Sequence, residues 1–391
     1  MPVVTTVSGV QYSGIWSLSG QANAKALGTW PVPYVSLYGW GRNGGGQLGV
    51  GDVTNRSSPT QVGSGNAWKS TSIGYQSSLS VKTDGTLWSW GSNASGQLGL
   101  NNATNYSSPK QVGTLTNWVQ AVYASIGSSV AIKTNGTLWA WGANQRGQLG
   151  LGDTTNRSSP VQVGALTNWS FISMGSGGHV VSLKTDGTLW TWGYNLTGQL
   201  GLNNATSYSS PKQVGALTTW LKVSAGSYFS SAITTSGALW SWGKNDFGQL
   251  GLGFSTVYSS GVSSPTQVGA LTTWRTASNG GDFIIANKSD ETLWSWGNGA
   301  SGRLGLGNTT SYSSPKQIGA LTTWKTISTS ESSSSGFAIK TDGTLWAWGA
   351  NNFGQLGQGN TLALSSPTQI GALASWLSIS AGNYSALAIA S

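Results

Sequence analysis

Side chains able to do covalent or metal chemistry are scarce in this chain. It has one His, His179, no Cys, and ten Asp and Glu residues in 391 positions. The absence of Cys excludes disulfides, thiolate nucleophiles and thiolate metal sites, and it leaves the redox compartment open. A metal site needs several converging ligands, and no second His is present to join His179. We therefore expect a structural role for His179, and no bound metal or cofactor.

The carboxylates are explained better by turns than by catalysis. Asp84, Asp186 and Asp342 each precede a Gly, and Asp favours turns because its side chain bonds to nearby backbone. No paired-carboxylate spacing of the glycoside hydrolase kind stands out, although carboxylates distant in the sequence can still meet in space. We therefore expect that the protein is not an enzyme. A hydrolase, the alternative, would have to show turnover on glycan substrates.

The basic residues and the Gly-rich motifs do not indicate nucleic-acid or phosphate binding. The 19 Lys and Arg give a formal net charge of +9, but they are spread along the chain without a run or stripe. Gly-Gln-Leu-Gly occurs six times, and residues 302–305 are a seventh copy with Arg303 in place of Gln. No copy is followed by the Gly-Lys-Ser/Thr of a phosphate-binding loop, so we interpret the motif as a repeated turn.

Composition limits the fold class to all-β. The chain has 58 Gly and 22 Trp, 38% hydrophobic residues and 7% charged residues. Gly weakens helices by about 1 kcal/mol per site, and this much Trp provides a core that disordered chains lack. No apolar run approaches the roughly 20 residues that cross a bilayer, so we expect no membrane insertion. The first six residues also lack the basic and apolar regions of a secretory signal.

The sequence is one repeated unit. Trp-Gly occurs seven times, 50 to 54 residues apart, beginning at Trp40, Trp90, Trp141, Trp192, Trp242, Trp296 and Trp348. A second Trp recurs two residues before this pair, except in the first copy, where Tyr38 replaces it, and a third opens each unit. Together the three positions account for 20 of the 22 Trp and leave out Trp16 and Trp30.

Each unit has the alternation of β-strands. In residues 78–82, Ser-Leu-Ser-Val-Lys, apolar and polar side chains alternate, and Trp88-Ser89-Trp90 alternates in the same way within residues 86–90. Asp84-Gly85 before it predicts a two-residue type I′ hairpin. Asp290-Glu291 lacks the Gly at the same place and predicts a different turn. Four short strands in about 51 residues form one propeller blade, and seven blades lie within the known range.

The two ends of the repeat region indicate a closed ring. The pattern begins in the middle of a unit, at residues 35–41, and ends in the first half of another, at residues 376–384. These halves add up to one unit, so we expect N- and C-terminal strands to share the seventh blade, which removes exposed sheet edges. An open solenoid, the alternative, would need polar caps at its ends. We therefore expect an N-terminal arm at 1–34 and a seven-bladed propeller at 35–391.

In the repeat, Gly-Thr-Leu-Trp is followed by Trp-Gly, then by Asn and by Gly-Gln-Leu-Gly. With this series of motifs, the chain resembles the regulator of chromosome condensation repeat family over roughly residues 35–391. The resemblance implies a seven-bladed propeller that serves mainly as a protein-binding scaffold. The best-known member of the family is a nucleotide exchange factor for a small GTPase and also binds chromatin, and a bacterial relative inhibits β-lactamases. Neither activity transfers residue by residue, because each depends on loops and tails that this chain does not match.

The N-terminal arm has a resemblance of its own. Residues 8–18 and 28–31, which contain Trp16 and Trp30, are similar to a short segment of bacteriophage structural and tail proteins. This resemblance implies a virion protein for structure or host attachment, in a tail, fibre or decoration, with the two Trp anchoring it to another virion protein or packing across the propeller. The alternative is a soluble bacterial regulator or enzyme inhibitor, cytoplasmic or secreted.

Positions that differ between the copies are the candidates for specific binding. Tyr, Phe and Arg are enriched at interfaces, and propellers display such loops in rings. The candidates that bind a partner protein or a surface glycan are Arg42, Arg56, Tyr106, Arg146, Arg157, Tyr194, Tyr208, Lys244, Phe247, Tyr258, Tyr312 and Phe353.

Overall fold

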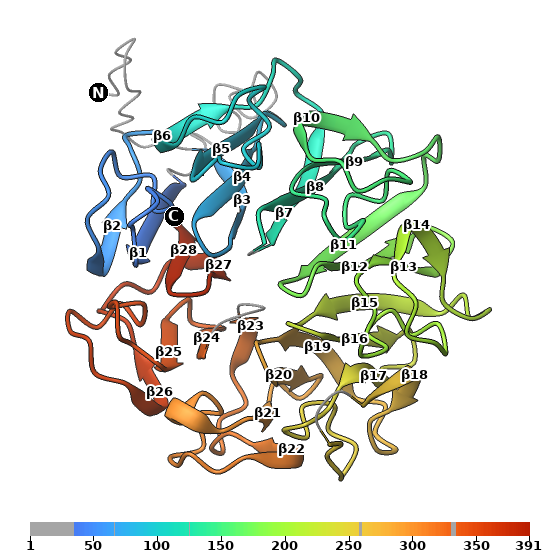
Figure 1. Ribbon diagram of the computed structural model, residues 1–391. Helices are drawn as coiled ribbons and strands as arrows, with labels where there is room; N and C mark the ends of the chain where they lie inside the picture. The colour runs from blue at the N-terminus through green and yellow to red at the C-terminus, as the bar shows by residue number, and fades with distance from the viewer. Residues whose placement is uncertain (1–34, 66, 125, 258–259, 330–333) are drawn as a thin grey trace, which may run out of the picture.

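The described part of the protein is a seven-bladed β-propeller. The computed structural model describes residues 35–391 except 66, 125, 258–259 and 330–333. These residues form seven four-stranded antiparallel sheets arranged around a central axis, which Figure 1 views end-on. Within these ranges, no helix has both the length and the apolar character needed to cross a membrane. The all-β propeller expected from the Trp spacing is confirmed.

Each blade runs outward from the axis in four strands. The first and innermost strands are β3 (Trp68–Ile73), β7 (Trp118–Ala124), β11 (Trp169–Gly175), β15 (Trp220–Ala225), β19 (Trp274–Asn279), β23 (Trp324–Thr329) and β27 (Trp376–Ala381). The second are β4 (Ser77–Lys82), β8 (Ser128–Lys133), β12 (His179–Lys184), β16 (Phe229–Thr234), β20 (Phe283–Lys288), β24 (Ser335–Lys340) and β28 (Ser385–Ala390). The third are β5 (Leu87–Gly91), β9 (Leu138–Gly142), β13 (Leu189–Gly193), β17 (Leu239–Lys244), β21 (Leu293–Gly297), β25 (Leu345–Gly349) and β1 (Ser36–Gly41). The fourth and outermost are β6 (Tyr106–Gln111), β10 (Arg157–Gln162), β14 (Tyr208–Gln213), β18 (Gly261–Gln267), β22 (Tyr312–Gln317), β26 (Leu364–Gln369) and β2 (Arg56–Gln61).

The ring closes through a blade shared by both ends of the described chain. We number the blades 1 to 6 from β3–β6 to β23–β26, and call the sheet β2-β1-β28-β27 the closing blade. In it, β1 pairs with β28 without a register break from Ser36 opposite Ala390 to Gly41 opposite Ser385. The expectation that N- and C-terminal strands share one blade is therefore confirmed, and the open solenoid is excluded.

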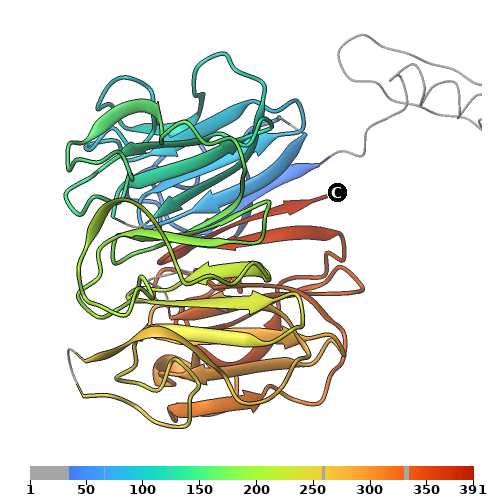
Figure 2. The same cartoon turned by 90° about the vertical axis from the view of Figure 1, so that its right-hand side faces the viewer.

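The propeller has two different faces. The turns between second and third strands, and the segments that lead from one blade to the next, lie on one side, which we call the hairpin face. The turns between first and second strands and the long loops between third and fourth strands lie on the other, the loop face. Figure 2 shows the hairpin face on its right, where β28 ends, and the loop face on its left.

The hairpin turn differs from the predicted type I′ geometry. The Gly85 amide donates to the Lys82 carbonyl at 3.0 Å, and Lys82 also donates to Thr86 at 3.0 Å. Gly85 has a φ of 78°, whereas Asp84 is not among the residues with positive φ. This is a three-residue loop with one left-handed residue, not a two-residue loop with two. The different turn expected at Asp290-Glu291 is also wrong, because Glu291 adopts a φ of 62° and donates to Lys288 at 3.0 Å.

A short hydrogen-bond chain explains the recurring Asp-Gly-Thr-Leu-Trp string. In blade 1, the Trp88 indole N–H donates to the Thr86 hydroxyl at 2.9 Å, and that hydroxyl donates to Asp84 at 2.7 Å. The Thr86 hydroxyl and amide hold the pKa of Asp84 below its usual value. The same chain occurs at Asp186, Asp290 and Asp342. These carboxylates are engaged in building turns.

The Trp of each Trp-Gly pair ties its blade to the preceding one. In blade 1, the Trp90 indole N–H donates to the carbonyl of Gln47, in the Gly-Gln-Leu-Gly loop of the closing blade, at 2.8 Å. All seven such indoles make this bond, at 2.8–3.1 Å, and all seven side chains are fully buried. We call this contact the latch. It explains why the two motifs recur together, because each is half of a contact between neighbouring blades.

A second set of bonds joins the blades near the axis. The hydroxyl of Ser72 in β3 accepts the backbone N–H of Tyr123 in β7 at 3.0 Å, and five further Ser residues repeat the contact. Val122 occupies the Ser position in β7. There the Gln120 side chain bridges to the backbone of Ile172 instead, donating at 3.1 Å and accepting at 3.3 Å. Every seam in the described ring is therefore tied at its inner strands.

Five Lys residues are part of this framework. Lys133 lies over the rings of Trp118 and Trp139, 4.7 and 3.5 Å from their centroids. Lys82, Lys184, Lys288 and Lys340 repeat the arrangement. Burial lowers the pKa of Lys133. Cation–π contact stabilises such positions, so these charges serve the fold and are not free for a partner.

His179 is a buried residue without ligand geometry. It is 0% exposed, and its Nε2 lies 3.1 Å from the Ser230 hydroxyl. Burial lowers its pKa to about 4. In the described part of the chain, no three His, Cys, Asp or Glu side chains gather where they could hold a metal.

The lowered pKa of His179 predicts a pH-dependent stability. Between pH 6.5 and 4 the unfolded chain binds a proton that the folded chain does not, so the free energy of unfolding should fall as the pH falls. We expect a loss of roughly 2–3 kcal/mol between pH 7 and pH 4.5, measured by denaturant titration. His179→Ser introduces the residue that four other copies carry and should abolish this part of the dependence. An equal loss in both proteins would contradict the prediction.

Candidate interaction surface

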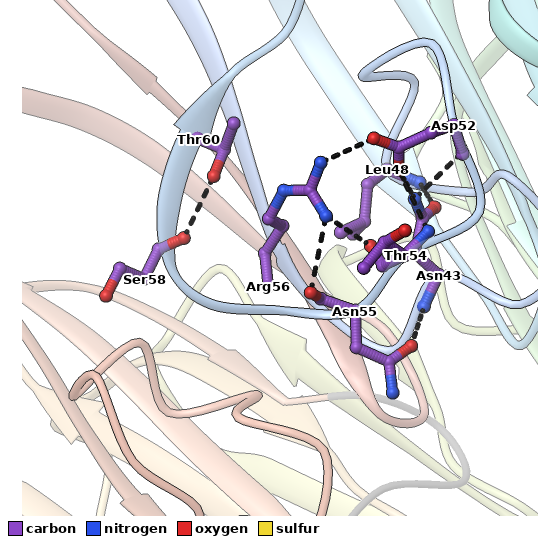
Figure 3. Close-up of polar contacts among 8 residues, drawn as sticks. All are labelled: Asn43, Leu48, Asp52, Thr54, Asn55, Arg56, Ser58 and Thr60. Atoms are coloured by element: carbon purple, nitrogen blue, oxygen red, sulfur yellow. Dashed lines mark hydrogen bonds and ion pairs between the residues drawn. The ribbon is translucent and has the colours of Figure 1, made fainter.

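One buried Asn organises the long loop of six of the seven blades on the loop face. In the closing blade the Asn43 side chain accepts the Leu48 N–H at 2.9 Å and donates to the Asp52 carbonyl at 2.9 Å (Figure 3). The backbone N–H of Asn43 donates to the side-chain oxygen of Asn55 at 2.8 Å. The Leu-to-Asn bond repeats at Asn93, Asn144, Asn195, Asn245 and Asn351. Blade 5 differs, with Gly299 at this place and a short 3-10 helix, η1 (Ala300–Gly302), after it.

The candidates that begin the fourth strands hold these loops in place. Arg56 forms an ion pair with Asp52 at 2.5 Å and donates to the Thr54 carbonyl at 2.9 Å (Figure 3). The Thr54 backbone N–H and the Arg56 guanidinium keep the pKa of Asp52 below its usual value. Arg157 and Asp153 form the same pair at 2.6 Å.

The Tyr candidates at the same position have local contacts too. Tyr106 lies with its hydroxyl 3.5 Å from the Asn102 amide, and Lys110 lies 5.4 Å from its ring centroid. Tyr208 and Tyr312 repeat both contacts. These outer candidates are thus engaged with their own blades. Tyr258 lies outside the described residues, as do Trp16 and Trp30 of the arm.

The candidates that follow Trp-Gly meet residues of neighbouring blades. The Arg42 guanidinium lies 4.7 Å from the ring centroid of Tyr75, 5.5 Å from Phe353 and 6.0 Å from Tyr384. Tyr384 also contacts the rings of Phe353, at 5.0 Å, and Tyr75, at 6.2 Å. The four side chains come from blade 6, the closing blade and blade 1. A cation is thus surrounded by three half-buried aromatic rings at the closing seams.

A second cation–aromatic group spans blades 2 to 4. Arg146 lies 4.4 Å from the ring centroid of Tyr194 and donates to the Gly177 carbonyl at 2.5 Å. Tyr194 packs edge-on against Tyr228 at 5.9 Å. Arg146 is exposed and the two Tyr are half-buried. This group therefore offers both a charge and apolar ring edges to a partner.

A third group lies between blades 4 and 5 and contains both signs of charge. Lys244 is 3.2 Å from Asp246 and 3.1 Å from Asp282, and 5.6 Å from the Phe247 ring centroid. Burial would lower the pKa of Lys244, but the two carboxylates, Asp282 above all, raise it. The ammonium is therefore fixed in its charged form.

These three groups all lie on the loop face, and we call them together the loop-face cluster. It consists of Arg42, Tyr75, Arg146, Tyr194, Tyr228, Lys244, Asp246, Phe247, Asp282, Phe353 and Tyr384. The sequence prediction included all the long-loop residues of the cluster except Asp246. It also missed four residues outside those loops, Tyr75, Tyr228, Asp282 and Tyr384. These lie in the turns between first and second strands, which also differ from copy to copy, so the same signal could have found them.

Comparison with known proteins assigns the repeat. The family model of the regulator of chromosome condensation (RCC1) repeat matches seven times, at residues 36–81, 84–132, 135–183, 186–233, 236–286, 290–335 and 342–389. The chain belongs to this family. Each match begins near a third strand and ends in the second strand of the next blade. The RCC1 repeat is therefore offset from the blade, which is why the closing blade is made from both ends of the series.

Relatives with an RCC1 propeller have different roles. The ultraviolet-B receptor UVR8 of Arabidopsis thaliana is 30% identical over 336 residues, which cover 85% of this chain and 64% of the receptor. The human E3 ubiquitin-protein ligase HERC2 is 28% identical over 346 residues, 86% of this chain but 7% of the ligase. The chain therefore spans less than two thirds of the receptor and a small part of the ligase.

Solved structures show the same RCC1 fold. Prp20p of Saccharomyces cerevisiae, a protein studied for its binding to Gsp1p and histones, superposes with a TM-score of 0.82 at 20% identity, covering 92% of each chain. Human WBSCR16 superposes with a TM-score of 0.80 at 20% identity, covering 91% of this chain and 98% of that one. At this identity the likeness concerns the fold alone.

Proposed function

We propose that this protein is a non-enzymatic binding module that holds a partner protein against its loop face, over the loop-face cluster. Half-buried Tyr and Phe beside Arg and Lys are the side chains enriched where interfaces bind tightly. The latch residues are nearly identical in all seven blades, while the cluster differs from blade to blade. Because the cluster residues differ between blades while the residues that hold the blades together stay the same, the loop face can be specific for one partner.

A protein partner agrees with what is known of similar propellers. Prp20p was studied for binding to Gsp1p and histones, and its structure was also solved bound to Kap60. On this chain, Arg42 and Arg146 would pair with acidic or aromatic groups of the partner, and the Tyr rings would exclude water around them. The carboxylates of Asp246 and Asp282 would repel a uniformly acidic partner at one edge of the cluster, which favours a partner with mixed charge.

Site-specific photocrosslinking tests the proposal. A benzophenone amino acid at Tyr228, in the loop-face cluster, should give a covalent adduct with one defined protein in the cells or particles that make this chain. The same probe at Tyr208, on the outermost strand of blade 3, is the matched control and should give none. Adducts only from Tyr208, or retention of the protein by a glycan array without any protein adduct, would overturn the proposal.

The partner, once found, permits a quantitative test. Arg42→Glu reverses the charge at the centre of the aromatic group and should weaken binding at least tenfold, mostly through faster dissociation. Lys110→Glu reverses a charge on the outer strand β6 and should change the affinity less than threefold. Titration calorimetry of both variants provides the comparison, and equal effects would contradict a site on the loop face.

We also propose that the module serves in a bacteriophage particle, as a structural or host-attachment protein. The support is the resemblance of residues 8–18 and 28–31 to tail-protein segments. Mass spectrometry of purified virions from the source should find the chain in stoichiometric amounts. Its absence from virions, together with its presence in uninfected bacterial cells, would favour the soluble regulator or inhibitor instead.

A further inference from the structure

Similar apolar grooves recur on the hairpin side of the blade seams. Four are described, between blades 1 and 2, 3 and 4, 5 and 6, and between blade 6 and the closing blade. Each is lined by the Trp that opens a blade, the aromatic residue of its third strand, the Pro of its fourth strand, and a Leu from the segment that leads into the blade. The connecting Leu residues, such as Leu217 and Leu373, are 42–49% exposed. Each groove therefore presents apolar surface to its surroundings.

The groove beside the closing blade differs from the others. Its cavity volume is about 520 Å³, against about 360, 410 and 400 Å³ for the other three. Tyr38 stands where the other blades have Trp, and Ala390 stands opposite Trp376 where five blades have the Lys that covers the rings. Thr234 also replaces this Lys in blade 4, yet that groove keeps Trp240 and is about 400 Å³. Tyr38 is thus the distinctive change, and it leaves room at this seam.

The additional room lies where the N-terminal arm joins the ring. Val35 is the first described residue, and Tyr38, three residues later, forms a wall of the groove. Trp30 precedes Tyr38 by eight residues, which can span up to about 26 Å when extended. A short tether of this kind raises the local concentration of the arm at the groove to about the millimolar range. The arm therefore meets this groove far more often than any free peptide would.

The groove and the arm also agree in chemistry. The groove is lined by Tyr38, Pro59, Ile370, Leu373 and Trp376 together with Ser, Gln, Gly and Ala, and has no charged residue. Among residues 1–34 the one charged side chain is Lys25. No charge therefore has to leave water when they meet. Pro31 and Pro33 flank the stretch after Trp30 and lower the entropy lost when it becomes ordered.

We propose that residues 28–34 dock in this groove, with the Trp30 indole against Tyr38, Leu373 and Trp376. At this seam the arm then fills the space that Tyr38 leaves where the other blades have Trp. It covers the seam between blade 6 and the closing blade, and it binds its own propeller before any other protein.

Because the chain has no Cys, a pair of introduced thiols reports this contact directly. Thr29→Cys with Leu373→Cys, treated with a short bismaleimide, should form an intramolecular cross-link, identified by peptide mass spectrometry of the full-length monomer. The matched control is Thr29→Cys with Leu217→Cys, a Leu of similar exposure (48% against 42% for Leu373) in the groove three seams away. We expect the first pair to react at least tenfold faster. Ser58→Cys and Ser264→Cys lie on the opposite walls of the same two grooves. Each combined with Thr29→Cys, they repeat the test and its control from the other wall.

Removal of the indole separates docking from simple tethering. Trp30→Ser in the Thr29→Cys, Leu373→Cys background should slow the cross-link at least tenfold, while the thermal unfolding midpoint stays that of the parent. An unchanged rate, equal rates at Leu373 and Leu217, or no cross-link at all would overturn the proposal. Cross-links formed only between two chains would overturn it as well, and would assign the groove to the arm of a second copy.

Discussion

Replacing Trp40 with alanine should lower the free energy of unfolding by about 3–5 kcal/mol. Trp40 is fully buried, its indole N–H donates to the Gln355 carbonyl at 2.8 Å, and its ring packs edge-on against Phe337 and Trp376. The substitution would open a cavity in the core between blade 6 and the closing blade and leave a buried carbonyl without its donor. Both effects act at the seam that closes the ring.

Chemical denaturation followed by circular dichroism measures this loss. Trp40→Phe keeps a ring but removes the donor and should cost about 1–3 kcal/mol. Trp192→Ala removes the same latch between blades 2 and 3, so its effect should equal that of Trp40→Ala if the closing seam is as strong as the others. Leu362→Ala, at a position 69% exposed, is the control for a surface change. A loss below 1 kcal/mol for Trp40→Ala would show that the latch does not hold the ring closed.

The second large effect is expected at Gly136, in the hairpin turn of blade 2. Its φ is 72°, its carbonyl accepts the Trp169 N–H at 3.1 Å, and a Cβ there would lie 2.1 Å from the Thr167 carbonyl oxygen. Gly136→Ala must therefore push apart the hairpin and the segment that leads into blade 3. We expect a loss of about 3 kcal/mol or more, from left-handed strain and a backbone collision together.

Gly164 separates these two contributions. It also has a left-handed φ, 63°, but a Cβ at this position meets no atom within 4 Å. Gly164→Ala should therefore cost about 1–2 kcal/mol, the strain alone. Denaturant midpoints of the two variants give the difference directly. Similar losses at both sites would mean that the hairpin and the connecting segment move apart freely, contrary to the close packing described above.

The architecture could be predicted from the sequence because the motifs that join neighbouring blades, Trp-Gly and Gly-Gln-Leu-Gly (Gly-Arg-Leu-Gly in one copy), recur with each of the seven copies of the repeat. The spacing of Trp-Gly predicted the number of blades, and the half units at 35–41 and 376–384 predicted the closure. The predicted turn type was wrong because Asp84-Gly85 is compatible with two hairpin geometries. The choice between them depends on the bond that Gly85 donates to Lys82 and the bond that Lys82 donates to Thr86. No short-range pattern distinguishes the two.

The candidate site could be predicted only in part. Arg42, Tyr194 and Phe353 stood out because they vary between copies, but sequence alone could not show which of them meet. Arg42 lies 342 positions before Tyr384, and the two come together only because the ring closes. Arg56 and Arg157 vary in the same way, yet they pair with Asp52 and Asp153 of their own loops. Variation shows where a side chain is free to differ; its neighbours decide whether it is available to a partner.

The latches all run in the same direction around the ring, each indole bonding to the blade before it, and this has a consequence for engineering. The bond from Trp40 to Gln355 joins positions 315 residues apart and matches the other six. Since Ser36 pairs directly with Ala390, a short linker could join the two ends of the ring, and the chain could be cut instead at the hairpin of any blade. Such circular permutants would make the same set of latches, so the arm could be moved to any seam without altering the loop face.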